Sequence, residues 1–226
     1  MLSAKNKNND YKVLNLVFNS IVGDARVQRT SRLLSKWGYR VIVCSVEEND
    51  RAYEFDDTFL CHIPMLKAEY SSIEAKTMFW KVISFFCSKK LFRQITLYHK
   101  YVCLNQAAYE LIEKHRPDIL ICNNFESLRA GYFAKQNMAI PFVYDAHELE
   151  KSRSTGRSKL QKLYVNFFEW FYARKADEVI TVSRGIADIL SKRFNRKNIH
   201  LFHNSPYFLS SFEGVPLRDQ LKLLPT

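Results

Sequence analysis

The residues best suited to chemistry stand directly after short apolar runs. Asp145, His147 and Glu148 follow the run PFVY and place two carboxylates beside one imidazole. An imidazole can donate a proton to a substrate hydroxyl or accept one from it, and a carboxylate can orient its ring. His147 is therefore the candidate catalytic residue, and Asp145 and Glu148 are candidate binding residues. The order H-E-L-E differs from H-E-x-x-H, so no zinc site is predicted. The alternative is a polar loop network with one satisfied histidine.

A second candidate site is the loop at residues 19–26, NSIVGDAR. A glycine before a helix lets backbone N–H groups approach a phosphate closely, which makes Gly23, Asp24 and Arg26 binding candidates. The single glycine fits neither the dinucleotide fingerprint nor a Walker motif. The alternative is that Gly23 only makes the turn and Asp24 caps the helix that follows.

Polar side chains also follow three other apolar runs. Asn123 and Asn124 carry amides that could bind sugar or phosphate oxygens, and an Asx turn is their alternative role. Ser183 is a binding candidate that also suits a helix N-cap. Asn204, in N-S-P, is a binding candidate that also suits a turn. No metal site and no cofactor are predicted.

These candidates need a scaffold that brings strand ends together. The runs KVLNLVF and YRVIVCSV are typical of buried strands, and the helical pattern between them stops at Gly38, which together indicate a βαβ unit. A weak strand is predicted at 58–63 and a long helical region over about 73–115. Further strands are predicted at 117–123, 141–147, 177–183 and 198–204, with helices at 126–137, 159–176 and 184–194. This alternation indicates an α/β fold with a mostly parallel sheet, whose ligands sit beyond the carboxyl ends of the strands.

Composition limits the class of protein. The chain has 226 residues, of which 47% are apolar, so it is too apolar for a disordered chain and long enough for one good core. Its first ten residues are polar, lack the apolar region of a signal peptide and are predicted to be disordered. No uncharged apolar stretch of about 18 residues suggests a membrane-spanning helix. Five widely spaced cysteines without C-x-x-C indicate a reducing, cytoplasmic environment.

Positive charge is concentrated in the middle of the chain. The net charge is +11, and residues 76–162 hold fifteen basic and seven acidic side chains. The segment 76–109 has no acidic residue and is rich in aromatics, a pattern that can lie against an anionic membrane. The alternative is that the aromatics pack on the sheet and the lysines are solvated. No nucleic-acid reader motif accompanies the charge, so nucleic acid is not a predicted partner. The predicted membrane-facing residues are Trp80, Lys81, Lys89, Lys90 and Arg93.

Taken in order, these motifs resemble the N-terminal domain of glycosyltransferase family 4, the retaining nucleotide-sugar transferases of the GT-B fold. The resemblance spans residues 11–207. It is carried by G-D-A-R-V-x-R, W-G-Y-R-V-x-V, R-P-D-I-L, P-F-V-Y-D-A-H-E-L, A-D-E-V-I-T-V-S-x-x-I-A-x-x-L and N-S-P.

The resemblance implies two Rossmann-like domains that face each other, the C-terminal one binding the nucleotide sugar and the N-terminal one the acceptor. It implies that the turn at Gly23 and Asp24 faces the donor diphosphate and the acceptor and that Arg26 lies at the helix start. It implies that His147 contacts the transferred sugar or the reacting centre, in a loop supported by Asp145 and Glu148. Transfer would need no metal, and the nucleotide sugar would be the co-substrate. The family usually has His or Asp where this chain has Asn123 and Asn124.

The expected organisation is a single Rossmann-like, acceptor-side domain at 11–207, with residues 208–226 starting an interdomain linker. No donor-site motif follows, so we expect no transfer by this chain without a donor-binding domain, which could be a separate chain. The expected acceptor is a cell-surface polysaccharide or a lipid-linked acceptor. The expected location is the cytoplasm, where the chain could also lie at the inner face of the cell membrane. Two alternatives remain: a non-catalytic, membrane-associated module or relic of polysaccharide assembly, and a nucleotide-binding domain of another α/β family.

Overall fold

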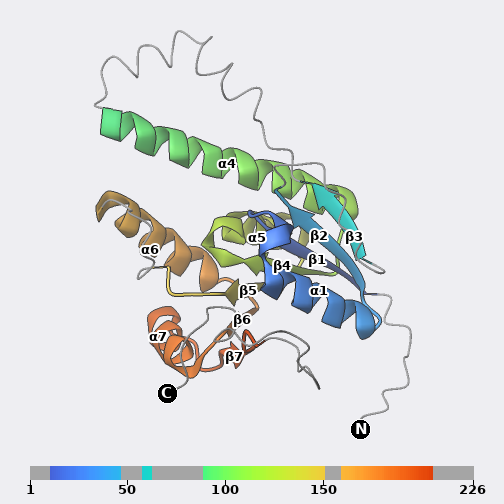
Figure 1. Ribbon diagram of the computed structural model, residues 1–226. Helices are drawn as coiled ribbons and strands as arrows, with labels where there is room; N and C mark the ends of the chain where they lie inside the picture. The colour runs from blue at the N-terminus through green and yellow to red at the C-terminus, as the bar shows by residue number, and fades with distance from the viewer. Residues whose placement is uncertain (1–10, 47–57, 63–88, 151–158, 206–226) are drawn as a thin grey trace, which may run out of the picture.

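The computed structural model describes residues 11–46, 58–62, 89–150 and 159–205. Strands and helices alternate along these ranges, as Figure 1 shows. The strands are β1 (Lys12–Val17), β2 (Arg40–Ser45), β3 (Thr58–His62), β4 (Ile119–Asn123), β5 (Phe142–Ala146), β6 (Glu178–Thr181) and β7 (His200–Leu201). The helices are the 3-10 turn η1 (Ile21–Gly23) and α1 (Ala25–Lys36), α4 (Lys89–His115), α5 (Asn124–Met138), α6 (Lys159–Ala173) and α7 (Arg184–Phe194).

The described strands form one sheet in the order β3-β2-β1-β4-β5-β6-β7, and every neighbouring pair is parallel. The α/β fold with a mostly parallel sheet is therefore confirmed. The central strands β1, β2 and β4 are apolar and buried along almost their whole length. This is expected of parallel strands that are covered by helices on both faces.

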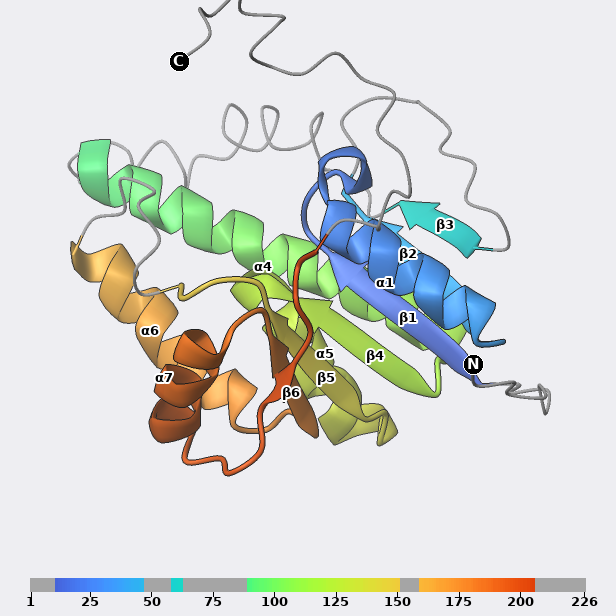
Figure 2. The same cartoon turned by 60° about the horizontal axis from the view of Figure 1, so that its bottom comes forward.

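Two apolar clusters lie on opposite faces of the sheet. Alternate residues of a strand point to opposite sides, and Leu14 and Leu16 belong to one cluster while Val17 belongs to the other. The smaller cluster joins β1 and β2 to α1 through Val27. The larger one joins the sheet to α4 and α5, and Figure 2 shows these two helices behind the sheet with α1 in front. Helix α1 is thus fixed beside the ends of β1 and β5.

Helix α1 begins and ends on local signals in the sequence. Asp24 caps its N-terminus, accepting a hydrogen bond from the backbone N–H of Val27 at 3.1 Å. At the other end Gly38 has φ 88°, and the N–H groups of Gly38 and Tyr39 bond the carbonyls of Ser35 and Leu34. These bonds form a Schellman motif, which needs a left-handed residue and so favours glycine. The predicted helix stop at Gly38 is confirmed.

Some predicted boundaries are wrong. Helix α5 starts at Asn124, two residues earlier than predicted, because Asn124 takes a left-handed φ of 62° that turns the chain directly from strand into helix. Strand β7 contains only two residues, since only Ile180 and Thr181 of β6 pair with it. The described part of the long helical region is α4. Of the predicted membrane-facing residues, Lys89, Lys90 and Arg93 lie in its first turns, whereas Trp80 and Lys81 lie outside the described residues.

No helix in the described ranges combines the length and apolar character needed to cross a membrane.

Candidate functional site

Four predicted site residues meet at the carboxyl edge of the sheet. Arg26 comes from the first turn of α1, Asn123 from the end of β4, Asp145 from the end of β5, and His147 from the loop that follows. Because all strands are parallel, these ends share one edge, and β1, β4 and β5 are consecutive neighbours in the sheet. The sequence thus identified the residues, and the sheet order explains why they gather.

Arg26 and Asp145 form a buried ion pair, with side chains 3% and 1% exposed. Nη2 of Arg26 donates to Asp145 Oδ1 at 2.7 Å, and Nε donates to Oδ2 at 2.9 Å. This two-pronged geometry uses the planar guanidinium fully. Nη1 donates to the backbone carbonyl of Phe202 at 2.6 Å, and the guanidinium lies 5.0 Å from the centre of the Phe202 ring. Arg26 therefore faces inward and ties α1, β5 and the segment after β7 together.

His147 stands at the exposed end of this network. Its Nε2 lies 3.2 Å from Asn123 Oδ1 and 3.6 Å from Asp145 Oδ2, and 17% of its side chain is exposed. The imidazole is thus held from behind by an amide and a carboxylate while one part of the ring reaches the surface. This is the arrangement of an oriented acid–base or hydrogen-bonding group.

Asn123 belongs to the support of the site. Only 2% exposed, it donates through Nδ2 to Asn15 Oδ1 at 2.5 Å and to the carbonyl of Leu16 at 2.9 Å. Its side chain makes no hydrogen bond to cap α5, so Asn123 does not take the alternative role of an Asx turn leading into that helix. Asn15 continues the network by donating to Ser31 Oγ of α1 at 2.9 Å. Sequence analysis missed Asn15, although an amide inside the apolar run KVLNLVF was the available signal.

The remaining predicted site residues have other local roles. Asp24 and Ser183 cap α1 and α7, the latter accepting from the N–H of Ile186 at 3.4 Å. Asn124 is nearly buried at the start of α5, and Glu148 is half-buried. Asn204 Oδ1 accepts a hydrogen bond from Nη2 of Arg29.

Gly23 is exposed at the end of η1, and its surroundings do not demand a glycine. A Cβ at this position would meet no atom within 4 Å, and Gly23 is not among the residues with positive φ. Neither backbone strain nor crowding among the described residues therefore explains the missing side chain. An exposed glycine leaves the backbone accessible, which is the property that a phosphate-binding turn requires.

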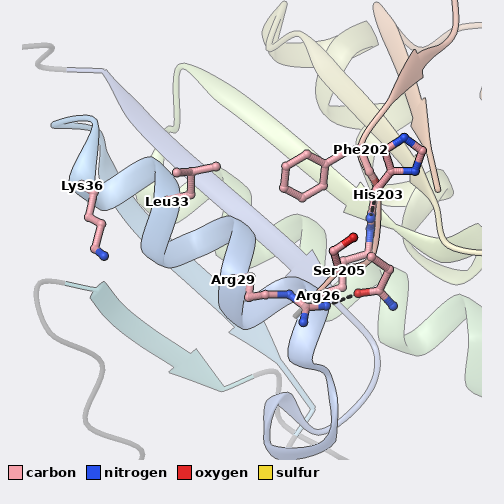
Figure 3. A pocket seen from close by; sticks show the side chains of 8 residues that line it. Arg26, Arg29, Leu33, Lys36, Phe202, His203 and Ser205 are labelled. Atoms are coloured by element: carbon pink, nitrogen blue, oxygen red, sulfur yellow. Dashed lines mark hydrogen bonds between the residues drawn. The ribbon is translucent and has the colours of Figure 1, made fainter. Parts of the chain in front are cut away.

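A groove of about 230 Å³ lies between α1 and the segment after β7 (Figure 3). Arg29, Leu33 and Lys36 line it from α1, and Phe202 lines it from the other side. The α1 residues recur at helical spacing and so share one face of the helix. The groove starts beside Arg26 and runs away from the sheet edge along α1.

A second buried polar cluster forms around Tyr144, the residue of β5 that precedes Asp145. Tyr144 donates its hydroxyl to Glu169 Oε1 at 2.8 Å, and Arg193 Nη1 lies 2.5 Å from Glu169 Oε2. Burial raises the pKa of Glu169, and burial together with the neighbouring Glu169 raises the pKa of Tyr144 far above its usual range. These bonds join β5 to α6 and α7 and hold the strand that carries Asp145.

The sequence model of Glycosyltransferase Family 4 matches residues 25–205, most of the chain. This chain belongs to glycosyltransferase family 4. The matched range includes Arg26, Asn123, Asp145 and His147, and the resemblance of its motifs to that family is confirmed. Comparison with curated protein sequences finds no match.

Solved structures show the same fold at low identity. Sucrose-phosphate synthase from Thermosynechococcus elongatus is 14% identical with a TM-score of 0.62, covering 95% of this chain and 53% of that one. UGT73P12 from Glycyrrhiza uralensis, complexed with glycyrrhetinic acid 3-O-monoglucuronide, is 13% identical with a TM-score of 0.53, covering 87% and 49%. UGT71G1 from Medicago truncatula, complexed with UDP-glucose, is 9% identical with a TM-score of 0.53, covering 88% and 52%. The family 4 chain thus has a GT-B half-fold and spans about half the length of these structures.

Proposed function

We propose that this chain is the acceptor-side half of a retaining glycosyltransferase that moves a sugar from a nucleotide sugar to a glycan or lipid-linked acceptor. The observation that carries the proposal is His147, a partly exposed imidazole held by Asp145 and Asn123 at the carboxyl edge of the sheet. Ligands of open parallel sheets bind at that edge. Family membership supports the reaction class, and the geometry of the site supports His147 as the residue that meets the sugar.

The roles of the residues follow from what sugar transfer requires. A departing nucleoside diphosphate is stabilised by positive charge and backbone N–H groups, and the exposed turn at Gly23 offers an unobstructed backbone for its phosphates. His147 contacts a hydroxyl of the transferred sugar or of the acceptor. Asp145 and Arg26 hold His147 in place, since their own polar atoms are already paired inside the protein. Positioning of this kind lowers the barrier without a protein nucleophile.

The donor is proposed to be a nucleotide sugar bound largely by a second domain. Support comes from the chain's coverage of about half of its structural neighbours, one of which is complexed with UDP-glucose. We therefore expect the 226-residue chain to transfer sugar only when a donor-binding domain is joined to it or mixed with it. Robust transfer by the purified chain alone would contradict this part of the proposal.

The test of His147 uses a protein in which transfer can be measured. His147→Ala is expected to lower kcat by about 10²-fold, the usual contribution of a positioned acid–base or hydrogen-bonding group. His200→Ala is the matched control, because His200 is 58% exposed beside Glu178 and lies on β7, two strands away from β5 in the sheet. Unchanged transfer in His147→Ala would remove the catalytic role from His147.

A second candidate function is a non-catalytic module that docks on anionic membranes in surface-polysaccharide assembly. It is favoured by α6, where Leu163 and Phe167 are 65% and 53% exposed one turn apart. Lys159 and Lys162 are exposed beside them. Apolar side chains flanked by lysines suit the interface of an anionic membrane. Flotation with phosphatidylglycerol vesicles tests this function: binding that is lost in Leu163→Asp supports it, and no flotation of the unmodified chain overturns it.

A further inference from the structure

The side chains behind His147 decide which of its two ring nitrogens can meet a ligand. We propose that Asn123 and Asp145 are positioning residues that hold His147 with its proton on Nε2, so that the lone pair on Nδ1 is presented to a sugar hydroxyl. The inference deepens the proposed function and rests on it, because His147 must face the substrate for the choice of nitrogen to matter.

The backbone carbonyl of Leu16 can only accept a hydrogen bond. Asn123 approaches this carbonyl at 2.9 Å and must therefore turn its NH₂ group, Nδ2, towards it. The same Nδ2 lies 2.5 Å from Asn15 Oδ1. The orientation of the Asn123 amide is thus fixed by a main-chain atom, and its oxygen Oδ1 is the atom that faces His147.

Nε2 of His147 consequently faces two hydrogen-bond acceptors. Asn123 Oδ1 lies at 3.2 Å and Asp145 Oδ2 at 3.6 Å. Both oxygens of the Asp145 carboxylate accept hydrogen bonds from the Arg26 guanidinium, so this group faces His147 as an acceptor. A ring nitrogen between two acceptors carries the N–H, and a neutral imidazole has only one. The lone pair of neutral His147 is therefore on Nδ1.

Arg26 makes this arrangement rigid. It holds both oxygens of Asp145, at 2.7 Å to Oδ1 and 2.9 Å to Oδ2, and both residues are almost completely buried. Rotation of the carboxylate away from His147 would break these charge-assisted bonds in a site with little water to replace them. Arg26 thus acts on His147 through Asp145.

The tautomer also selects the kind of ligand group. Within the described residues Nδ1 of His147 has no hydrogen-bond partner. A nitrogen lone pair accepts a hydrogen bond from a hydroxyl and repels a phosphoryl oxygen. The group that meets neutral His147 is therefore a hydroxyl of the sugar or the acceptor, and the diphosphate must be bound elsewhere on the edge.

The test is a long-range ¹H–¹⁵N imidazole spectrum of the ¹⁵N-labelled 226-residue chain at about pH 9, above the ordinary imidazole range. The signals of His147 are those that disappear in His147→Ala. We expect a pyrrole-type Nε2 and a pyridine-type Nδ1. His203 is the internal control with the opposite pattern, because its Nδ1 lies 3.0 Å from the carbonyl of Val182 and must carry the proton there. A protonated Nδ1 on His147, or two averaged nitrogens, would overturn the inference.

A variant separates positioning from a merely structural role. Asn123→Ala removes one of the two acceptors, so its His147 nitrogens are expected to move towards averaged values while the thermal melt stays cooperative. In a transfer-competent protein the same variant should lower kcat several-fold with little change in the KM for the nucleotide sugar. Unmoved His147 nitrogens in folded Asn123→Ala would show that Asn123 does not select the tautomer.

Failure of this inference and failure of the proposed function give different results. If His147→Ala leaves transfer unchanged while the spectrum shows a protonated Nε2, the proposed role of His147 in transfer is wrong, whereas the inferred tautomer of His147 is correct. If His147→Ala lowers transfer strongly while the spectrum shows a protonated Nδ1, the function stands and the inference is wrong.

Discussion

The buried ion pair allows the architecture of the site to be tested by stability alone. Arg26→Met keeps most of the aliphatic stem but leaves the Asp145 carboxylate buried without its cation. The two side chains are 3% and 1% exposed, so water cannot easily take the place of the guanidinium. Removing one partner of such a pair typically costs about 3–5 kcal/mol. We expect Arg26→Met to lower the free energy of unfolding by that amount.

The matched control is the surface ion pair between Lys135 and Asp177. Its N···O distance of 2.6 Å is similar, but its side chains are 33% and 39% exposed. Exposed pairs contribute about 0.2–1 kcal/mol because water and salt screen the charges. Lys135→Met removes the same number of charges as Arg26→Met, so the difference between the two variants measures the effect of burial.

Urea unfolding of the 226-residue chain provides the measurement. With a slope of about 1–3 kcal/mol per molar urea, a loss of 3–5 kcal/mol moves the midpoint by about 1 M or more. Arg26→Met combined with Asp145→Leu should be more stable than Arg26→Met, since no unpaired charge is then buried. Equal midpoints for Arg26→Met and Lys135→Met would refute the claim that burial makes the loss of Arg26 costly. If the double variant is no more stable than Arg26→Met, the unpaired Asp145 carboxylate is not the cause of the lost stability.

Three further predictions concern the surrounding fold. Gly131→Ala places a Cβ 2.5 Å from Cys122 Sγ, so overpacking of about 1–3 kcal/mol should outweigh the gain of about 1 kcal/mol in helix propensity and lower the urea midpoint. Gly185→Ala, whose Cβ meets nothing within 4 Å, should leave the midpoint unchanged or raise it. Burial raises the pKa of Cys122 to about 12, so iodoacetamide at pH 8 should label it only in unfolded protein, as peptide mass spectrometry will show. Burial also raises the pKa of Glu169 above its ordinary 4.5, so the folded protein binds this proton more tightly. The contribution of Glu169 to stability therefore falls as pH rises above 4.5. In Glu169→Gln the urea midpoint should depend less on pH over the range above 4.5.

Much of the fold could be predicted because its signals are local. The apolar strands, the Asp24 cap and the Gly38 stop are each set by a few neighbouring residues, and their alternation indicates a parallel sheet. The rule that ligands bind at the carboxyl edge of a parallel sheet also predicts His147 and Asp145 as site residues. The predicted start of α5 is two residues late, because asparagine favours a left-handed φ but its type alone does not show that the helix begins at Asn124.

The partners inside the site could not be predicted, because they depend on sheet order. Arg26 and Asp145 are 119 residues apart, and Asn123 is 108 residues from Asn15. No spacing pattern encodes such pairs; they arise when β1, β4 and β5 become neighbours. For this reason Arg26 and Asn123 were predicted as ligand-binding residues, whereas their polar atoms are used within the protein and leave His147 as the exposed member.

The cost of burying Arg26 and Asp145 supports a geometric role for the pair. A buried ion pair loses much of its Coulombic gain to desolvation, and apolar residues of similar volume often stabilise a fold equally well. Stability alone therefore gives little reason to bury this pair where Asp145 Oδ2 lies 3.6 Å from Nε2 of His147. An apolar pair would leave Nε2 of His147 with Asn123 as its single acceptor, and the ring could then turn or exchange its proton between nitrogens. We infer that the charge is kept at this edge because the carboxylate orients His147 towards the sugar.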